Sequence, residues 1–397
     1  MMQDNSRAWL EIDLDAIRHN TREIRKHISA HAEMIGVVKA DGYGHGAVEV
    51  SRCILQNGVT RLAVSQLDEA IQLRQHGITA PILLLSDLEP ERAEGLLTYD
   101  VAQIVFTREF AESLSRKATE LGKIAKIHIK LDTGMGRVGF RAEDPAVVEE
   151  IVAISKMPGL CLEGIFTHFA VSDEGDAGAK VYTEKQFALF REVCRQLKAR
   201  GVEIPLHHAA NSAAVLRYPE MHLDAVRAGI ILYGFYPSEE TKVSGVSLKP
   251  AMTFKARLTA VKKVPAGTSL SYGCTYTTKR ESVIATVPVG YADGYFRALS
   301  NKARVLIGGQ YAPICGRVCM DQFMVDVTDL VAGGTSVSVG DEVVLMGRQG
   351  NLEISAEELA GLCDTINYEV ICSPGKRVPK RYVAGGQTVS VMNVLIG

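Results

Sequence analysis

Short apolar or β-branched runs alternate with longer amphipathic segments between about residue 34 and residue 235 of this 397-residue chain. Such alternation is typical of repeated βα units around a parallel sheet. Eight runs of this kind predict an α/β fold whose N-terminal domain is a (β/α)8 barrel of the TIM type. The eight runs cover residues 34–38, 62–65, 82–85, 102–105, 127–131, 162–167, 206–209 and 225–228.

The clearest helical segment between these runs covers residues 183–198. Thr183 is a good N-cap residue, and Gly201 is suited to end the helix. The apolar residues of the segment recur at helical spacing, which predicts one buried stripe. The stripe comprises Phe187, Phe190, Val193, Cys194 and Leu197.

A second domain is predicted after the polar stretch 237–242, which is typical of a linker. The chain is longer than one hydrophobic core usually serves, and glycine-rich turns beyond residue 248 separate strand patterns. We therefore expect the barrel in residues 1–240 and an all-β C-terminal domain in residues 241–397, with segment 8–14 as a strand of either domain. The strand patterns are carried by Val283, Ala285, Val287, Val325, Val327, Val337, Val339, Val343 and Val344.

The overall charge and the cysteines restrict the kind of partner. A formal net charge of -2 gives no global field that would attract nucleic acid or an anionic membrane. The chain starts with polar and acidic residues where a secretory signal needs an apolar core, and no apolar stretch reaches membrane-spanning length. The eight cysteines lack paired CxxC spacing and mostly sit in apolar runs, which favours reduced, buried thiols over a metal site. We expect a cytoplasmic protein with a small-molecule ligand, without metal, nucleic acid or membrane.

The stretch from Val37 to Gly46 places a lysine, Lys39, at the end of an apolar run. A lysine at the end of a buried strand is desolvated, which lowers its pKa and leaves part of the amine neutral and able to form a Schiff base. Three glycines follow within five residues, so the backbone can approach a ligand, and Tyr43 offers a hydroxyl donor. The alternative is a solvated lysine at a strand end beside an ordinary turn.

Four other predicted strand ends carry unusual polar residues, and in a barrel all five ends meet at one face. Each of these residues also has a purely structural interpretation when it is taken singly. Arg137 could belong to a surface ion pair, and His168 could be a hydrogen-bonded histidine of the core. Asn211 with Ser212 could cap a helix, and Arg227 could only support the structure. Taken together, they favour a site at the carboxyl end of the barrel. Asn211 and Ser212 before a helix, with Gly229 and Ile230 after the eighth strand, form a predicted phosphate cradle. A Schiff-base lysine beside a phosphate cradle indicates pyridoxal 5'-phosphate.

The stretch from Val38 to Gly46 closely resembles the cofactor-attachment site of bacterial alanine racemases. Four further stretches resemble that family in its order and spacing, and the resemblance runs from about Trp9 to Tyr382. These stretches are Ser271-Tyr272-Gly273, the segment from Gly290 to Tyr295, the segment from Gly316 to Gln322, and Ile366-Asn367-Tyr368-Glu369.

The resemblance implies a pair of bases on opposite faces of the substrate α-carbon. Lys39 would hold the cofactor and act on one face, and Tyr272, arriving from the partner subunit of a homodimer with shared active sites, would act on the other. Inversion through a planar carbanion needs a donor and an acceptor on opposite sides. A neighbouring cation must favour the phenolate of Tyr272, and His168 and Arg227 are the implied relay.

The same resemblance assigns the remaining positions. Arg227 would face the pyridine nitrogen and leave it unprotonated, since a guanidinium does not hand over its proton. Arg137 would contact the cofactor's phenolic oxygen and the substrate carboxylate, which Met320 of the other subunit would also bind through its backbone N–H. Lys130 matches a supporting position that carries a carbamate in many members. The other implied positions are Tyr43, Asn211, Ser212, Gly229, Ile230 and Tyr368 at the phosphate, Asp321 as support, and Asp173, Tyr291 and Arg317 at a narrow entrance.

The leading hypothesis is an alanine racemase that supplies D-alanine for peptidoglycan. Decarboxylases of the same architecture generally place a glutamate at the pyridine nitrogen, so Arg227 argues against them. A non-catalytic cofactor carrier would need only the barrel, so the second domain with Tyr272 and Met320 argues against that reading. Within racemases, a broader serine and alanine racemase stays open because a small apolar pocket rejects a hydroxyl only weakly, although Tyr368 favours alanine.

Overall fold

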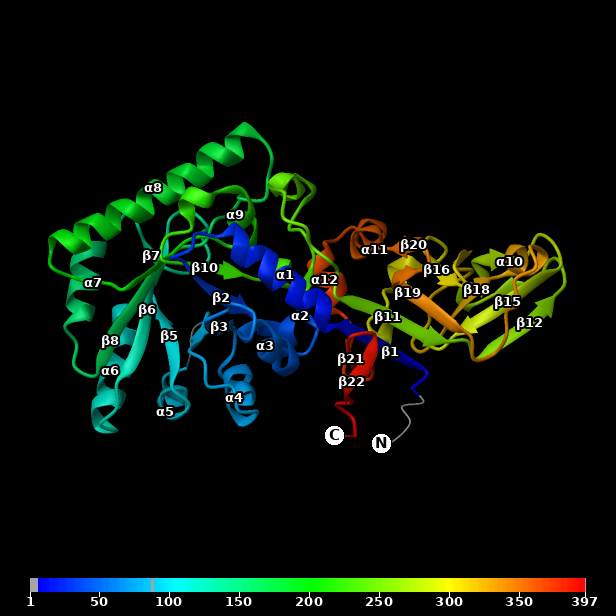
Figure 1. Ribbon diagram of the computed structural model, residues 1–397, viewed down its shortest axis with the longest axis horizontal. Coiled ribbons are helices and arrows are strands. Elements are labelled where there is room, and N and C mark those ends of the chain that lie inside the picture. Colours follow the sequence, from blue (N-terminus) through cyan, green and yellow to red (C-terminus); the bar gives the residue numbers. More distant parts are fainter. Residues whose placement is uncertain (1–5, 87–88, 397) are drawn as a thin grey trace. The chain divides into compact units, whose positions relative to one another are not determined.

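Figure 1 shows the computed structural model of the chain, which describes residues 6–86 and 89–396. The chain divides into two compact units. The first, here called the barrel unit, comprises Ala16–Gly42 and Gly46–Lys249. The second, here called the β unit, comprises the segment up to Asp15, Tyr43–His45, and the chain from Pro250 onward.

The described barrel unit is built on eight parallel strands, as the sequence predicts. The sheet runs in the order β10-β2-β3-β4-β5-β6-β8-β9. Backbone N–H groups of Asp224 and Arg227 donate to the carbonyls of His207 and Ala210 at 3.1 and 3.0 Å, which joins the last strand to its neighbour and closes the ring. The strands are β2 (Glu33–Val37), β3 (Arg61–Val64), β4 (Ile82–Leu84), β5 (Val101–Val105), β6 (Ala125–Asp132), β8 (Leu160–Phe166), β9 (Leu206–His208) and β10 (Ala225–Ala228), with the short β7 (Phe140–Arg141) beside β6.

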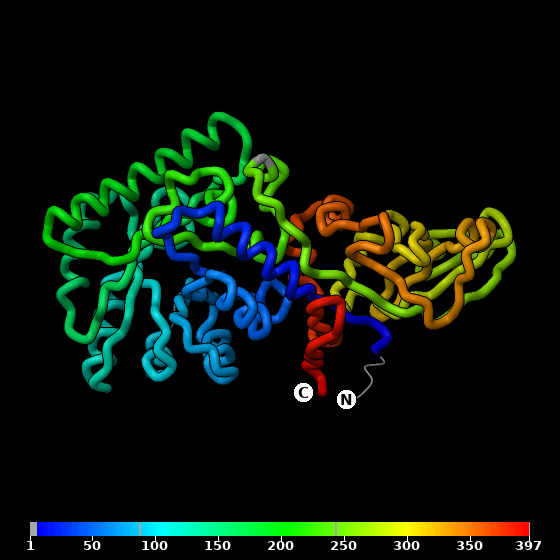
Figure 2. The backbone as a smooth tube through the Cα atoms, in the orientation of Figure 1, coloured from blue at the N-terminus to red at the C-terminus, as the bar shows by residue number. Residues whose placement is uncertain are grey.

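Amphipathic helices alternate with these strands, and Figure 2 traces the alternation along the chain. Each longer helix buries one apolar stripe, as α6 does with Ala111, Leu114 and Ala118. This pattern is the one expected of helices that cover a barrel. The helices are α1 (Leu14–His27), α3 (Ala47–Leu55), α4 (Leu67–Gln75), α5 (Ala93–Thr98), α6 (Arg108–Glu120), α7 (Val147–Ser155), α8 (Ala177–Ala199) and α9 (Ser212–Arg217), with 3-10 turns η1 (Pro90–Arg92), η2 (Pro219–Met221), η3 (Ile230–Tyr233) and η4 (Glu239–Ser244). The short element α2 (Lys39–Tyr43) is a left-handed turn.

Helix α8 begins earlier than the sequence pattern predicts. Its N-cap is Asp176, whose carboxylate accepts the backbone N–H groups of Gly178 and Ala179 at 2.8 and 3.0 Å. Thr183, the predicted cap, is buried inside the helix and donates its hydroxyl to the carbonyl of Ala179. The predicted start was therefore wrong, while Gly201 follows the helix end with a φ of 76°, as predicted.

The stretch 237–242 is ordered structure rather than a polar linker. It forms most of η4 and belongs to the barrel unit. Ser238 donates its hydroxyl to the carbonyl of Asp173 at 2.7 Å, and Thr241 is buried. This contact and the burial of Thr241 fix the stretch on the barrel unit, although Glu239, Glu240 and Lys242 stay exposed, and composition alone does not reveal either feature.

The β unit is mostly β, and its largest sheet has the order β17-β16-β19-β11-β1-β21-β22 with β20 on β19. Strand β1 (Ala8–Asp13) pairs antiparallel with β11 (Met252–Arg257) and parallel with β21 (Lys380–Ala384). In its described part, α10 (Thr328–Ala332), α11 (Ala356–Cys363) and α12 (Asn367–Cys372) accompany the strands. The others are β12 (Ala260–Val264), β13 (Ser269–Leu270), β14 (Tyr276–Thr277), β15 (Ser282–Val287), β16 (Arg304–Ile307), β17 (Gln310–Pro313), β18 (Phe323–Asp326), β19 (Glu342–Gln349), β20 (Leu352–Ile354) and β22 (Gln387–Met392), with η5 (Tyr272–Cys274), η6 (Tyr291–Asp293) and η7 (Arg297–Leu299).

Two details of this unit correct the sequence analysis. Val327, Val337 and Val339 were predicted in strands, but Val327 caps α10, and Val337 and Val339 lie in the loop before β19, where Val339 is exposed. All eight cysteines are free, but Cys161, Cys274 and Cys372 are exposed rather than buried. The prediction of buried thiols, which rested on the apolar sequence neighbours of the cysteines, was therefore wrong at these three positions.

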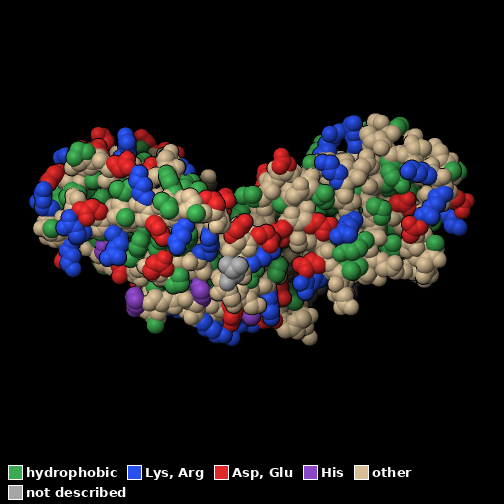
Figure 3. Space-filling model, turned by 90° about the horizontal axis from the view of Figure 1, so that it is seen from above, with side chains coloured by type: hydrophobic (Ala, Val, Ile, Leu, Met, Phe, Trp, Pro, Cys, Tyr) green, Lys and Arg blue, Asp and Glu red, His purple; other side chains and the backbone are tan. Residues whose placement is uncertain are grey.

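The surface carries mixed charge. On the face shown in Figure 3, Lys and Arg side chains lie among Asp and Glu side chains. Within the described ranges, none of the helices combines the length and apolarity needed to cross a bilayer.

The packing of α8 can be tested with two phenylalanines of its predicted stripe. Phe190 is buried, whereas Phe187 is half-buried. We expect Phe190→Ala to lower the free energy of unfolding by about 3–5 kcal/mol, because it removes a fully packed ring. Phe187→Ala, the matched control, should cost less than half as much. Urea unfolding followed by circular dichroism measures both, and equal losses would contradict the packing.

Candidate active site

The carboxyl ends of the barrel strands bring several of the predicted residues together. Arg227 of β10 lies 3.3 Å from Nδ1 of His168, which follows β8. Burial lowers the pKa of His168 well below its ordinary value, and the charges of Arg227, Lys130, Arg137 and Lys39 lower it further. The imidazole of His168 is therefore neutral, and four cationic side chains surround it.

Arg227 is the best anchored of these cations. Its Nη1 donates to Nδ1 and to the carbonyl of His208, and its Nη2 donates to the carbonyls of Thr167 and Ala209, over distances of 2.8–3.1 Å. Burial, together with the charge of Arg137, lowers the pKa of the guanidinium to about 9, so it stays charged at neutral pH. Within the described residues no acceptor faces its Nε, which leaves one N–H for a ligand. A pyridine nitrogen is an acceptor of the required kind.

Lys130 is buried at the end of β6. Its Nζ donates to the carbonyl of Leu131 at 2.8 Å and lies 5.2 Å from the ring centre of Phe166. Burial, with the charges of Arg227 and Arg137, lowers the pKa of Lys130 to about 7. A large fraction of the amine is therefore neutral at physiological pH, the form that reacts with carbon dioxide.

Lys39 lies just beyond β2 and is only half-buried, so the predicted burial at a strand end was too strong. The residues after it form a left-handed turn, with φ values of 53° at Ala40, 52° at Asp41 and 61° at Gly42. Each non-glycine residue in this conformation costs roughly 1–2 kcal/mol. The glycines at this turn thus serve backbone geometry, as the sequence suggested.

A carboxylate that the sequence analysis did not single out stabilises this turn. Glu69 of α4 accepts the backbone N–H of Ala40 at 2.6 Å and those of Ser65 and Gln66 at 2.7 and 3.0 Å. Asp41 in turn accepts the N–H of Ala47 at 2.8 Å. Glu69 therefore connects the backbone next to Lys39 with the loop after β3.

Two residues of the predicted phosphate cradle are in contact. Ser212 at the start of α9 accepts the backbone N–H of Gly229 at 2.9 Å, and Ile230 follows as the first residue of η3. Asn211 caps α9 by accepting the N–H of Ala214 and also accepts the hydroxyl of Ser172, both at 3.0 Å. The side chain of Asn211 thus positions the loop, as the helix-cap reading expects.

The predicted residues of the β unit form their own cluster. Ser271 donates its hydroxyl to the carbonyl of Arg317 at 2.8 Å, next to Tyr272. The backbone N–H of Ala292 donates to the carbonyl of Met320 at 3.0 Å, and Gly290 packs so closely on Met320 that a Cβ would lie 2.3 Å from its carbonyl oxygen. The side chains of Tyr272, Tyr291 and Met320 are nevertheless 73%, 44% and 52% exposed.

Other predicted residues are placed individually. The rings of Tyr43 and Tyr368, both in the β unit, lie 6.2 Å apart, and burial raises the pKa of Tyr43. Asp321 accepts from Arg377 at 2.7 Å. Asp173 belongs to the barrel unit, whereas Tyr291 and Arg317 belong to the β unit, so the entrance remains a prediction.

The site residues fit a phosphorylated pyridine cofactor better than a metal ion. No group of three or more His, Cys, Asp or Glu in the described ranges is placed to hold a metal. The uncommitted Nε of Arg227, the half-exposed Lys39 and the contact between Ser212 and Gly229 match the ring nitrogen, the aldehyde and the phosphate of pyridoxal 5'-phosphate.

Comparison with known proteins covers nearly the whole chain. The family models "Alanine racemase, N-terminal domain" and "Alanine racemase, C-terminal domain" match residues 12–237 and 251–382. Alanine racemase 1 of Clostridium acetobutylicum is 47% identical over 97% of this chain and 98% of its own length.

Solved structures give the same relationship. Alanine racemase of Clostridium difficile 630 superposes with a TM-score of 0.94 at 40% identity over 99% of this chain and 100% of its own. A histidine racemase from Leuconostoc mesenteroides superposes with a TM-score of 0.86 at 29% identity over 96% of this chain and 99% of its own. The fold is thus shared by racemases named for different amino acids.

The lowered pKa of Lys130 predicts a pH dependence of stability. Its folded pKa of about 7 lies below the ordinary 10.5, so the folded chain binds fewer protons than the unfolded chain between these pH values. Stability should therefore rise with pH across this window, by up to about 1.4 kcal/mol per pH unit from this group.

Lys130→Met should flatten this rise, because the substitution removes the titrating amine. The free energy of urea unfolding, measured from pH 7 to pH 10 in carbonate-free buffer, gives the slope. Lys126→Met, at a surface lysine of the same strand that pairs with Asp100, is the matched control. A Lys130→Met slope equal to that of the unsubstituted chain would show that Lys130 does not titrate in this range.

Proposed function

The chain belongs to the alanine racemase family, and from this premise we propose that it interconverts L-alanine and D-alanine with Lys39 and Tyr272 as its two bases. The observation that carries the proposal is the full-length relationship, in which both family models match in order along one chain. The arrangement around Arg227 supports it, because a buried cation with one uncommitted N–H suits the ring nitrogen of the family's cofactor.

Pyridoxal 5'-phosphate, when bound, supplies an electron sink that makes the α-proton of an amino acid acidic. Lys39 provides the amine that attaches the cofactor. Ser212, Gly229 and Ile230 would bind its phosphate, and Tyr43 and Tyr368 are the hydroxyl donors that the family resemblance assigns to it. Arg137 binds the phenolic oxygen, with His168 and Asn211 shaping the pocket around the ring.

The two bases act from opposite faces of the α-carbon. Lys39 moves the proton on one face and Tyr272 on the other, since a single base would have to cross the plane. Tyr272 is largely exposed in the single chain, together with Tyr291 and Met320. We infer that a second copy of the chain covers this group, so that each active site of a homodimer receives Tyr272 and Met320 from the partner subunit.

Arg227 determines what happens to the carbanion. A guanidinium donates a hydrogen bond but keeps its proton, so the ring nitrogen stays neutral and withdraws electrons weakly. A weak electron sink would favour return of the α-proton over transamination or decarboxylation. Arg227 therefore favours racemisation over the reactions of enzymes that place a carboxylate at this nitrogen.

The substrate is a small amino acid. Arg137 and the backbone N–H of Met320 bind its carboxylate, while Asp173, Tyr291 and Arg317 narrow the entrance, and Lys130 and Asp321 support this arrangement. Because a histidine racemase shares the fold, the fold alone does not select alanine, and a broader serine and alanine racemase is the alternative. The eight free cysteines support a reducing compartment, the cytoplasm, where the product D-alanine would enter peptidoglycan synthesis.

The test of the proposal is a spectrum and an assay on the purified chain. Bound cofactor should give visible-range absorbance that is lost in Lys39→Ala, and an assay coupled to D-amino-acid oxidase should show D-alanine formed from L-alanine faster than D-serine from L-serine. A colourless chain that takes up no added cofactor, or one without racemase activity, would refute it. Equal rates with both substrates would favour the broader racemase.

The role of Tyr272 has its own test. Tyr272→Phe should abolish α-proton exchange from one alanine enantiomer while exchange from the other persists, because only one face loses its base. Proton–deuterium exchange in heavy water, followed by NMR for each enantiomer, measures this. Tyr276→Phe, which removes a hydroxyl bound to Asp326 at 3.0 Å in the same unit, is the control. Symmetric exchange in Tyr272→Phe would exclude Tyr272 as a base.

A further inference from the structure

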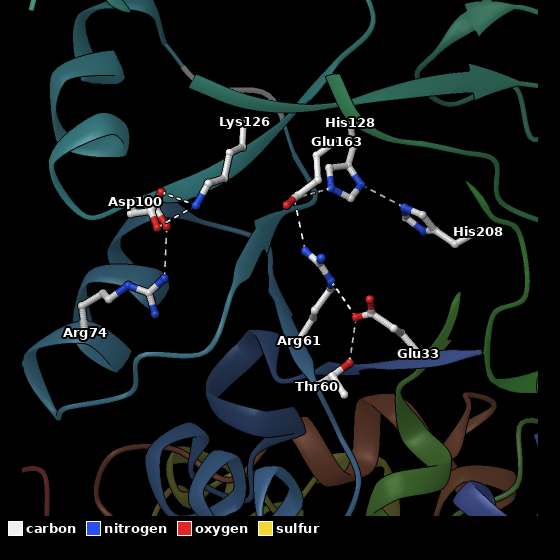
Figure 4. Close-up of polar contacts among 9 residues, drawn as sticks. All are labelled: Glu33, Thr60, Arg61, Arg74, Asp100, Lys126, His128, Glu163 and His208. Atoms are coloured by element: carbon white, nitrogen blue, oxygen red, sulfur yellow. Dashed lines mark hydrogen bonds and ion pairs between the residues drawn. The ribbon is translucent and has the colours of Figure 1, made fainter. Parts of the chain in front are cut away.

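A continuous line of hydrogen bonds crosses the inside of the barrel from Arg227 to its amino end. Nη1 of Arg227 lies 2.9 Å from Nδ1 of His208, and Nε2 of His208 lies 3.0 Å from Nδ1 of His128. Nε2 of His128 lies 3.1 Å from Oε2 of Glu163, and Nη1 of Arg61 lies 3.2 Å from the same oxygen. Figure 4 shows the two imidazoles pointing toward each other, with Glu163 and Arg61 beyond them.

The two ends of this line fix its direction. A guanidinium has only donors, so Nδ1 of His208 must accept, and its proton must lie on Nε2. That proton is donated to Nδ1 of His128, whose own proton must then lie on Nε2. A carboxylate has only acceptors, so Glu163 receives this last proton. Both histidines are therefore neutral and protonated on Nε2.

The surroundings agree with this assignment. His128 and His208 are 1% and 0% exposed, and burial lowers the pKa of both imidazoles. The hydrogen bond from His128, opposed by burial but aided by Arg61, lowers the pKa of Glu163 to about 2, so Glu163 is ionised. Arg61 is held in turn by Glu33, with Nε 2.8 Å from Oε2.

The barrel makes room for this line at one position. A Cβ at Gly164 would lie 2.4 Å from Nδ1 of His128, closer than any side chain tolerates. The ring of His128 therefore packs directly on the backbone beside Glu163. His208 is fixed similarly, stacked on Phe166 with ring centres 4.8 Å apart.

We propose that Glu163 is a positioning residue for the racemase reaction, which fixes the tautomers of His128 and His208 and thereby the orientation of the Arg227 guanidinium. The reversed arrangement places a lone pair of His128 against the carboxylate and an N–H of His208 against Arg227. Without Glu163, the reversed arrangement keeps only the clash between His208 and Arg227. The original arrangement then leaves the buried Nε2–H of His128 without an acceptor, at a cost of about 1–3 kcal/mol. In part of the molecules an N–H of His208 then faces Nη1 of Arg227, so the guanidinium loses this acceptor and shifts against its three carbonyl acceptors.

The test combines NMR and kinetics on the cofactor-loaded enzyme. In protein labelled with 15N-histidine, the rings of His128 and His208 should both show the neutral Nε2–H signature from pH 6 to pH 9. His128→Asn assigns one set of signals by its loss. An Nδ1–H ring or an imidazolium at either position in the unsubstituted enzyme would overturn the proposal, whatever the variants do.

Substitutions at Glu163 test its contribution. Glu163→Leu should divide the ring signals between tautomers and lower kcat about tenfold or more, with KM changed less. Glu163→Gln keeps an acceptor and should preserve the tautomers and most of kcat. The matched control is Asp100→Asn, a carboxylate at the same end of the barrel that pairs with Lys126, and it should change neither readout.

The possible outcomes separate this proposal from the function on which it rests. A folded Glu163→Leu enzyme with unchanged ring signals and unchanged kcat would refute the positioning role. If Glu163→Leu does not fold, the unsubstituted spectrum and Glu163→Gln decide, and loss of the tautomers in Glu163→Gln would also refute it. If the unsubstituted enzyme forms no D-alanine, the proposed function fails, while the ring signals still report on the line of hydrogen bonds.

Discussion

The carboxyl end of the barrel is arranged around one buried guanidinium, that of Arg227, whose donors need acceptors. Removing a charged group from water costs several kcal/mol unless its donors are satisfied. The Nη1 and Nη2 donors of Arg227 are satisfied by the carbonyls of Thr167, His208 and Ala209 and by the ring of His208, while its Nε has no acceptor within the described residues. These acceptors follow or end two neighbouring strands, so the charge fixes the strand ends from which His168 and the loop before α9 start. Polar contacts thus hold this end of the barrel, and the strands below it combine apolar packing with the buried contacts of His208, His128 and Glu163.

The backbone after Lys39 is fixed by a different mechanism. Successive residues in the left-handed conformation are unfavourable. Ala40 and Asp41 adopt this conformation although, unlike glycine, they carry a Cβ atom. The carboxylates of Glu69 and Asp41 compensate by accepting backbone N–H groups at 2.6–2.8 Å. Strained backbone is common where a fold must hold a functional group in one orientation. The left-handed backbone next to Lys39 limits the directions in which its side chain leaves the turn, as the base role proposed for Lys39 requires.

The barrel was predictable because its signal is local. Each strand is a short buried run, as in β5, and each run lies within a few residues of its predicted position. The start of α8 was missed because Thr183 and Asp176 are both good caps and only tertiary packing decides between them. Glu163, His128 and His208 could not be joined from the sequence, since 35 and 80 residues separate their contacts. Motifs identified the residues proposed to bind the cofactor and the substrate, whereas the contacts among Glu163, His128 and His208 became visible only once the strands were aligned.

Positive charge is crowded at the carboxyl end of the barrel. The charges of Arg227, Lys130, Arg137 and Lys39 all act on His168, and those of Arg227 and Arg137 also act on Lys130. Like charges at this density repel, and the protein relieves part of the repulsion by lowering the pKa of Lys130 and keeping His168 neutral. An anionic ligand relieves the rest. In the proposed function, the cofactor phosphate and the substrate carboxylate would each bring negative charge to this face and lower the repulsion among its cations. A carbamate on Lys130 would act in the same direction.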